Sequence, residues 1–145
     1  MAATSRAEAN WEGDLAKGGG HVKPASGAFG ELPISWAARS ERPSDINKTS
    51  PEELLAAAHS ACFSMAFANG LSKAGHHVER LDTTAEVDFV PGQGITTIRL
   101  SVRGRVQGLD ERGFQKLADE AKDSCPVSKL FHGNAEISLD ARLVG

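Results

Sequence analysis

The feature that most constrains this chain is a stretch of 19 residues, Leu54 to Ser72, without a formal charge. It is long enough to cross a lipid bilayer. However, it contains a histidine, an asparagine and three serines, and alanine supplies many of its apolar positions. A helix buried on most sides inside a protein fits this pattern better than a membrane span does. We therefore expect no membrane partner.

The apolar surface of this helix must be buried, and this indicates how many subunits the protein has. The chain has 145 residues, a length that suits one domain, and we expect residues 1–145 to form it. A small monomer supplies enough cover only with difficulty, so we expect a second subunit. A sheet of the same chain that wraps the helix is an equal alternative on the residues alone.

Local signals mark the ends of the helix. Ser50 suits the N-cap, Pro51 suits the first helical position, and Glu53 completes a capping box with Ser50. Gly75, just beyond the last helical residues, is the natural stop. The helix is therefore predicted by its ends as well as by its composition.

The region before the helix is predicted to hold two strands and a long loop. Residues 7–12 alternate between apolar and polar side chains, which is typical of a half-buried strand. After glycine-rich turns, residues 21–23 start a return strand. Residues 32–49 are rich in proline, serine and charge, and they predict a long loop of the kind that is often functional.

A β-hairpin is predicted after the helix, where two alternating runs flank the turn Pro91 to Gly94. If Val90 pairs with Ile95, the partners along the hairpin sum to 185. This register places Glu86 opposite Arg99 on the polar face and Val87 opposite Ile98 on the apolar face.

The last third of the chain predicts two further helices and a strand. Asp110 caps a helix that Pro126 ends, because a residue before proline avoids the α region. A short helical turn follows over residues 126–131, and residues 136–143 alternate as a closing strand. The predicted fold class is α+β, with antiparallel sheets around a long central helix.

Charge and targeting signals narrow the function. The net charge of −3 and the absence of a lysine or arginine cluster argue against nucleic acid as a partner. The N-terminal residues lack the apolar core of a secretory signal, so a reducing cytoplasm is the expected compartment. Two cysteines are too few for a disulfide-scaffolded secreted fold.

The two cysteines, Cys62 and Cys125, are open to packing, metal binding or catalysis. Cys62 lies in the middle of the central helix, where a cysteine is most often a small buried hydrophobe. Cys125 precedes Pro126 at a helix N-terminus, where unpaired N–H groups favour a thiolate. That it is simply a small residue in a turn between two helices is an equal alternative. His59 and Cys62 share a helix face, but the spacing predicts neither a zinc site nor a hydrolase strongly.

Glu52 has no evident local role, whereas Glu53 belongs to the capping box. A carboxylate in the first helical turn can pair with a cation, and Arg39, Arg42 and Lys48 in the preceding loop are candidates. For each of them a solvated loop charge is the simpler interpretation.

Four segments of the sequence resemble the OsmC/Ohr family of thiol peroxidases. The longest is the run Thr49-Ser-Pro-Glu-Glu-Leu-Leu-Ala-Ala-Ala-His-Ser-Ala-Cys62-Phe-Ser-Met65. The others are Cys125-Pro-Val-Ser128, Asn10-Trp-Glu-Gly-Asp14 and Asp82-Thr-Thr-Ala85. The resemblance therefore covers nearly the whole chain, and the spacing of both cysteines and Glu52 makes it specific.

The resemblance implies a role for each site residue. Cys62 matches the peroxidatic cysteine, Cys125 the resolving cysteine, and Glu52 the glutamate that orients an arginine. The opening resembles the OsmC branch, in which the loop before the helix supplies the arginine; Arg39 fits best and Arg42 is the alternative. The Ohr branch uses an earlier arginine, where this chain has only Lys17. The implied fold is an intertwined homodimer with active sites at the subunit interface.

The implied activity is reduction of organic hydroperoxides without a cofactor or metal. Cys62 attacks the peroxide and becomes a sulfenic acid, Cys125 condenses with it, and an external dithiol, such as a lipoylated protein, reduces the disulfide. Apolar neighbours such as Phe63 and Met65 are expected to admit an alkyl chain. The alternative is a non-enzymatic stress or ligand-binding protein on the same fold, with redox-sensing cysteines.

Local reasoning and the resemblance differ on which cysteine has the lower pKa. A helix N-terminus favours the thiolate of Cys125, whereas the family assigns the attack to Cys62. We expect Arg39 and Glu52 to converge on Cys62 and to outweigh the helix end.

Overall fold

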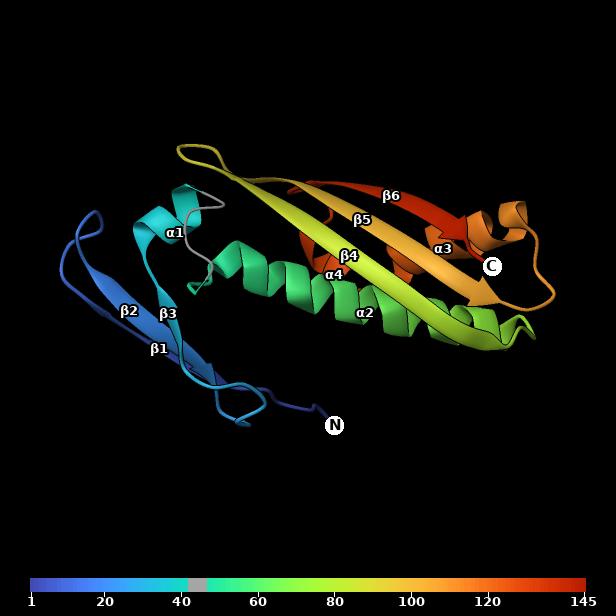
Figure 1. The fold of residues 1–145 in the computed structure, drawn as a ribbon, viewed down its shortest axis with the longest axis horizontal. Helices are drawn as coiled ribbons and strands as arrows, with labels where there is room; N and C mark the ends of the chain where they lie inside the picture. Colours follow the sequence, from blue (N-terminus) through green and yellow to red (C-terminus); the bar gives the residue numbers. More distant parts are fainter. Residues whose placement is uncertain (42–46) are drawn as a thin grey trace. The chain divides into compact units, whose positions relative to one another are not determined.

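The computed structural model of the chain describes residues 1–41 and 47–145. They form two compact units, Met1–Leu54 and Leu55–Gly145, called here the N-terminal and the C-terminal unit. Figure 1 shows the elements of both units in chain order. That residues 1–145 act as one domain stays a prediction.

The N-terminal unit contains a small antiparallel sheet and a short helix. Its strands, in the order β1-β2-β3, are β1 (Ala7–Glu12), β2 (Gly19–Pro24) and β3 (Leu32–Ile34), and its helix is α1 (Trp36–Ser40). The two strands predicted at residues 7–12 and from residue 21 are confirmed. The half-buried character of the first is not, because every residue of β1 is exposed in this chain.

The predicted long loop over residues 32–49 is wrong in part, because it contains β3 and α1. The helix begins where the Ser35 hydroxyl accepts a hydrogen bond from the Ala38 amide at 3.1 Å, and Ala38 is buried. Pro33 lies in β3, at the edge of its sheet, where a missing N–H is tolerated. The proline and serine content that suggested a loop thus marks a sheet edge and a helix cap.

The central helix α2 (Pro51–Lys73) has the predicted ends. The Glu53 amide donates to the Ser50 hydroxyl at 3.1 Å, and the Glu53 carboxylate accepts from Thr49 Oγ1 at 2.7 Å. At the other end, the His76 amide donates to the Leu71 carbonyl at 3.0 Å while Gly75 has a positive φ of 88°.

One stripe of α2 is buried by the chain itself. His59, Phe63, Phe67 and Leu71, spaced four residues apart, are each 0% exposed. On another face Met65 is 72% exposed. The C-terminal unit therefore buries one stripe of the helix and leaves another face open, and the choice between a second subunit and a sheet of the same chain as its cover stays a prediction.

By length and hydropathy alone, α2 could also span a membrane, with a mean hydropathy of 1.3 and 22% of its most apolar window buried. Its phenylalanines, however, pack in a core with strands and a helix of the same chain. One stripe of α2 is therefore that of a core helix, while burial on most sides, as the sequence predicts, is not seen in the single chain.

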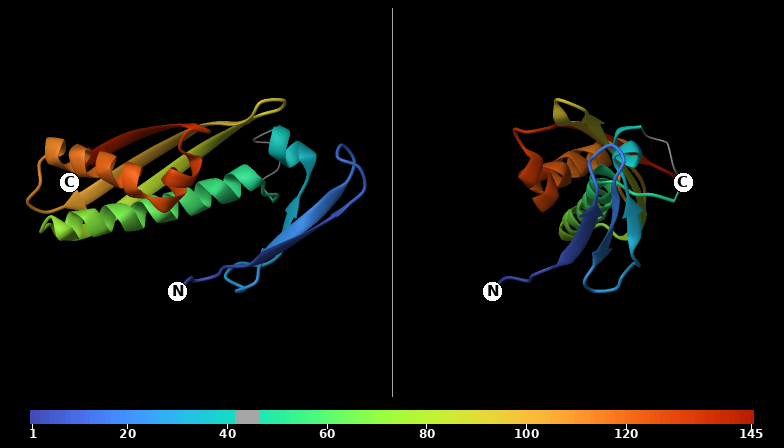
Figure 2. Two further views of the ribbon diagram at one scale, coloured as in Figure 1. Left: turned by 180° about the vertical axis from the view of Figure 1, so that it is seen from behind. Right: turned by 90° about the vertical axis from the view of Figure 1, so that its left-hand side faces the viewer.

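The C-terminal unit packs three helices on one face of a second sheet. The strands, in the order β4-β5-β6, are β4 (Val78–Val90), β5 (Gly94–Val106) and β6 (Glu136–Leu143), and α3 (Glu111–Ser124) and α4 (Pro126–Phe131) follow β5. Figures 1 and 2 show α2, α3 and α4 on the same side of this sheet. The core lies between them; Phe67 and Phe114, from α2 and α3, have ring centroids 4.9 Å apart.

The α+β class is confirmed, but one strand pairing differs from the antiparallel expectation. β6 runs parallel to β5, with Ile98 opposite Ile137. The two helices between these strands form a crossover that returns the chain to the start of β5, and a crossover of this kind joins parallel strands.

The register of the β4–β5 hairpin is confirmed along most of its length. Glu86 pairs with Arg99, and Arg99 Nε lies 3.2 Å from the Glu86 carboxylate. The predicted pairing at the turn is wrong, because Val90 pairs with Gly94 and a bulge between Asp88 and Phe89 restores the register.

The tighter turn has a local cause. The Gln93 amide donates to the Val90 carbonyl at 2.9 Å, and Gly92 has a positive φ of 85°. Proline followed by glycine at the two central positions is the signature of a type II turn. One residue fewer is then needed to connect the strands.

Candidate active site

Cys62 and Cys125 meet in the C-terminal unit. The Cys125 thiol donates a hydrogen bond to Cys62 Sγ, and 2.9 Å separate the two sulfur atoms. Both are free thiols, 63 residues apart in the chain. Because a disulfide bond is about 2.05 Å long, the sulfurs need to approach by only about 1 Å to form one. The fold therefore presents a reactive pair rather than two separate packing residues.

Pro126 explains why Cys125 lies where it does. Cys125 ends α3 with its amide bonded to the Ala121 carbonyl at 2.9 Å, and it has an extended ψ of 123°. Proline excludes the α region for the residue before it, so the chain turns at Cys125 and starts α4. Cys125 is 0% exposed in this turn.

The surroundings of Cys62 in the C-terminal unit raise the pKa of its thiol. Burial raises the pKa of the Cys62 thiol, and the hydrogen bond from Cys125 raises it further. A hydrogen bond from the Val127 backbone amide lowers it, but by less, so that the pKa of Cys62 is raised overall. No cation is among the described groups that shift the pKa of this thiol.

The Val127 amide belongs to the first turn of α4, and Cys125 makes no side-chain capping bond there. That the N-terminus of α4 favours a thiolate at Cys125 stays a prediction. The Val127 amide at this helix end bonds to the sulfur of Cys62. Cys62 is the residue to which the resemblance assigns the attack on the peroxide.

Arg39 and Glu52 form an ion pair in the N-terminal unit. Arg39 Nε lies 3.0 Å from Oε1 of Glu52, and Arg39 Nη2 lies 2.9 Å from Oε2. The Glu52 side chain is 6% exposed and that of Arg39 is 33% exposed. A two-point contact of this kind holds the guanidinium plane in one orientation. Glu52 thus has the cationic partner expected of it.

The predicted alternative, Arg42, lies outside the described residues. The third candidate cation, Lys48, is among the described residues, but Arg39 is the partner of Glu52 in this ion pair. The structure therefore gives a geometry only for Arg39 among the two candidate arginines.

A pocket of about 340 Å³ in the N-terminal unit has Arg39 in its wall. Apolar side chains supply most of the remaining lining, from Trp11, Leu15, Ile34, Trp36 and Pro51, together with Ser35. The sequence pointed instead to Phe63 and Met65 as the apolar surroundings. Phe63 is in fact part of the core, and its ring centroid is 5.6 Å from that of Phe67.

His59 is a packed residue, as the pattern favours, but it also has a polar contact that the sequence did not suggest. Its Nε2 lies 2.8 Å from the hydroxyl of Ser128 on α4. Burial lowers the pKa of His59. In the part of the chain that the structure describes, no group of three or more His, Cys, Asp or Glu side chains could hold a metal ion.

Helix α2 carries one member of each predicted pair. Glu52 lies in its first turn and Cys62 follows ten residues later. At about 1.5 Å per residue, ten residues correspond to about 15 Å along the helix axis. The structure thus brings together Arg39 with Glu52, and Cys62 with Cys125.

Comparison with known proteins gives consistent matches. The family model of the OsmC-like proteins matches residues 43–140. The chain is 39% identical over 146 residues to a protein named peroxiredoxin OsmC of Escherichia coli K12, and the match covers 99% of each chain. It is 33% identical over 97 residues to an organic hydroperoxide resistance protein of Xanthomonas axonopodis pv. citri, over 63% of this chain and 65% of that protein.

A solved structure supports the fold. The organic hydroperoxide resistance protein OsmC of Legionella pneumophila superposes with a TM-score of 0.73 and 24% identity. The superposition covers 98% of both chains. The fold of this chain therefore resembles that of a protein of low sequence identity.

Proposed function

Because this chain belongs to the OsmC family of proteins, we propose that it is a thiol-dependent peroxidase that reduces organic hydroperoxides to alcohols. The proposal includes a part in defence against oxidative or osmotic stress, in the cytoplasm. The names of its relatives, a peroxiredoxin and an organic hydroperoxide resistance protein, support this class of reaction.

The observation that carries the proposal is the 2.9 Å contact between the sulfur atoms of Cys62 and Cys125. Two free thiols this close can form a disulfide with little movement of the chain. In a reducing compartment they can form a disulfide during each catalytic cycle and lose it again.

The first step is attack by the Cys62 thiolate on the terminal oxygen of the hydroperoxide. The new S–O bond forms as the O–O bond breaks, the sulfur is oxidised to a sulfenic acid, and the alkoxide leaves and takes up a proton. The Val127 amide favours the thiolate, but the raised pKa of Cys62 calls for further stabilisation. A cation near the sulfur would supply it.

We assign that role to Arg39 of a second subunit. Glu52 and Cys62 of one helix are about 15 Å apart along its axis, which is more than a glutamate side chain spans. The resemblance to the OsmC/Ohr family implies a homodimer with active sites at the subunit interface. In a homodimer with the two helices antiparallel, the pair of one subunit would lie beside the cysteines of the other.

The exposed face of α2 supports such a dimer. Ala57, Ala61 and Met65 follow one another at intervals of four and are exposed in the single chain. Small residues allow a second helix to approach closely, and burial of this face would remove apolar surface from water. The same assembly would provide the cover that the uncharged helix needs.

The pocket beside Arg39 supports an organic rather than an inorganic peroxide. Its volume of about 340 Å³ and its two tryptophans suit an alkyl or aryl group. The guanidinium in its wall would stabilise the negative charge that develops on the leaving oxygen.

In the second step Cys125 condenses with the sulfenic acid. The S–S bond forms as the S–O bond breaks, and the hydroxide leaves with the Cys125 proton as water. An external dithiol then reduces the disulfide to two thiols and is itself oxidised. No cofactor takes part in this scheme.

The test is consumption of peroxide by the purified protein in the presence of a dithiol. We expect faster turnover of cumene or t-butyl hydroperoxide than of hydrogen peroxide. If no peroxide is consumed, the chain is instead a stress or ligand-binding protein on this fold, with redox-sensing cysteines.

The shared site has a separate test. Cys62→Ser and Arg39→Met chains, each expected to keep at most about 1% of the wild-type activity alone, are unfolded and refolded together. Random pairing should restore about a quarter of the wild-type activity, because half of the dimers are mixed and each holds one intact site of two. If both residues had to come from one chain, the mixture would stay inactive.

A further inference from the structure

A second buried contact joins the two elements that carry the cysteines. His59 on α2 and Ser128 on α4 meet with 2.8 Å between Nε2 and the hydroxyl oxygen. His59 is 0% exposed and Ser128 is 4% exposed. Neither side chain has a part in the peroxidase chemistry proposed above, yet a buried polar pair is costly unless it is well made.

The two contacts are regularly spaced. His59 lies three residues before Cys62, and Ser128 lies three residues after Cys125. Residues three apart on a helix share one face. The histidine–serine contact and the sulfur–sulfur contact are therefore successive steps of a single interface, along which α2 and the start of α4 run in opposite directions.

Helix α4 depends on this interface for its position. It has six residues, and its N-cap residue, Cys125, makes no side-chain capping bond. A helix this short does not hold its shape alone in water. His59 contacts it at two points, through the Ser128 hydroxyl and through Phe131, whose ring centroid is 5.9 Å from that of the imidazole.

The contribution of His59 comes from its hydrogen bond rather than from charge. Burial lowers the pKa of this histidine, because the imidazolium would lose its hydration. At neutral pH the ring is therefore uncharged. Its Nδ1 atom is buried and has no hydrogen-bond partner in the described part of the chain, so Nε2 makes the one polar contact that orients the ring.

We propose that His59 and Ser128 are positioning residues that hold Cys125 ready to condense with the oxidised Cys62. The inference rests on the proposed function, since the step it concerns is the second step of that cycle. In that step the Cys125 sulfur must line up with the S–O bond of the sulfenic acid. The contact between His59 and Ser128, called here the tether, lies one helical turn from Cys125. It restrains α4 while Cys62 is oxidised to the sulfenic acid.

The tether should affect the second step far more than the first. Attack on the peroxide needs only the Cys62 thiolate and its cation, whereas disulfide formation needs Cys125 in one orientation. Ser128→Ala removes the hydroxyl and leaves a buried imidazole nitrogen without its partner. Ser128→Thr keeps the hydroxyl and serves as the conservative variant.

The experiment follows a single turnover with t-butyl hydroperoxide by rapid quenching. In Ser128→Ala we expect first-turnover peroxide loss within about twofold of wild type, and disulfide formation slower by about tenfold. The Cys62 sulfenic acid, trapped with dimedone and quantified by mass spectrometry, should accumulate. Ser128→Thr should restore most of the rate, and His59→Gln, whose amide nitrogen lies near the position of Nε2, should fall between the two.

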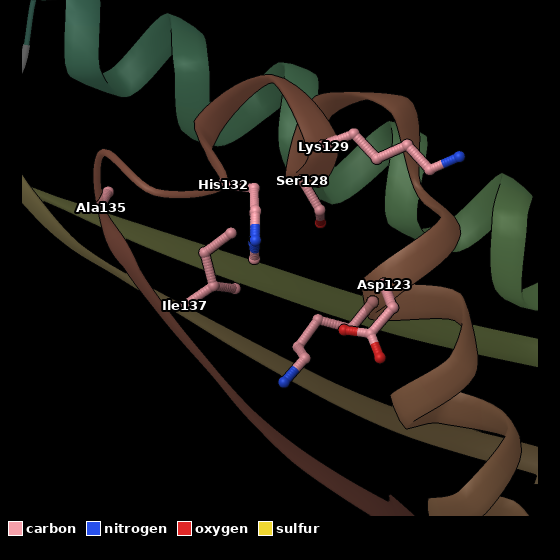
Figure 3. A pocket seen from close by; sticks show the side chains of 7 residues that line it. Asp123, Ser128, Lys129, His132, Ala135 and Ile137 are labelled. Carbon is pink, nitrogen blue, oxygen red and sulfur yellow. The ribbon is translucent and has the colours of Figure 1, made fainter.

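Two results would overturn the proposal. One is disulfide formation at the wild-type rate in Ser128→Ala. The other is an equal slowing of both steps, which indicates a general loss of structure. Lys129→Ala is the matched control, because Lys129 is the next residue, is exposed, and lines with Ser128 the same pocket of about 590 Å³ (Figure 3). It should change neither step.

A measurement without peroxide separates this proposal from the proposed function. Equilibration with reduced and oxidised glutathione gives the stability of the Cys62–Cys125 disulfide directly. Ser128→Ala should shift this equilibrium by about tenfold toward the dithiol, even if the wild-type protein consumes no peroxide. An unchanged equilibrium would count against the tether, whatever the peroxidase assay shows.

Discussion

The Arg39–Glu52 pair of the N-terminal unit and the Cys62–Cys125 pair of the C-terminal unit differ in their physical character. The first is ionic, and its arginine side chain is 33% exposed. The second joins two sulfur atoms, and its surroundings raise the pKa of Cys62. Under the proposed function, the two pairs supply different parts of one site: the first supplies the cation and the second the nucleophile, whose pKa no described cation shifts. Such a division would keep the thiol of an unassembled chain protonated and therefore slow to react.

The largest effect is expected from the cysteines themselves. Cys62→Ser removes the nucleophile and should lower peroxide turnover by at least about a thousandfold. Cys125→Ser should allow at most one turnover and leave a sulfenic acid that dimedone traps. The measurement is peroxide consumption per subunit with excess dithiol. If the two variants behaved in the reverse way, Cys125 would be the attacking residue.

A smaller effect is expected from the ion pair. Arg39→Met should lower kcat/KM by about 10²–10³, the loss typical of one electrostatic contact to a developing oxyanion. Because a cation favours the thiolate, its removal should also move the midpoint of the pH profile of Cys62 alkylation upward. Arg39→Lys keeps the charge but not the two-point contact with Glu52, so it should lie between wild type and Arg39→Met.

The control for the arginine is Arg112→Met, which removes an exposed guanidinium from α3. It should change neither kcat/KM nor the pH profile. An unchanged midpoint of the alkylation profile in Arg39→Met would mean that Arg39 does not stabilise the Cys62 thiolate. The Arg39–Glu52 pair would then have no part in activating the nucleophile.

The smallest effect concerns stability in the C-terminal unit. Burial lowers the pKa of His59 from its ordinary value of 6.5. The unfolded chain therefore binds this proton before the folded chain does, and His59 makes stability fall as the pH drops below about 6.5. In His59→Gln the slope of unfolding free energy against pH should be shallower, by at most about 1.4 kcal/mol per pH unit. Urea unfolding of both proteins between pH 5 and 8 measures the difference, and equal slopes would contradict it.

The parts of the fold that local patterns determine were predictable from the sequence. Ser50 and Gly75 mark the ends of α2, and Pro126 separates α3 from α4, because caps and proline act on neighbouring residues. Alternation gave the hairpin register from Glu86 and Arg99. The bulge near the turn and the parallel pairing of β6 depend instead on how distant segments fit together.

The candidate site also has parts that the sequence indicated and parts that depend on distant segments. The resemblance assigned Cys62, Cys125, Arg39 and Glu52, and the structure places them in two close pairs. The pocket lined by Trp11 and other residues of the N-terminal unit was not predicted, since its lining comes from separate strands and turns. Nor was the contact of His59 with Ser128, 69 residues away, because no local signal connects them.

Helix α2 fixes the distance and the angle between Glu52 and the buried stripe that begins at His59. This limits where the chain tolerates an inserted residue. One residue inserted between Glu52 and His59 would rotate all that follows by about 100° and advance it by about 1.5 Å. If the stripe from His59 to Leu71 keeps its place in the core, the helical residues before the insertion, Glu52 among them, turn by that angle relative to the stripe. Insertions in this helix should therefore be far more damaging than insertions in the exposed turn at Gly27 to Gly30, although neither need alter a reacting residue.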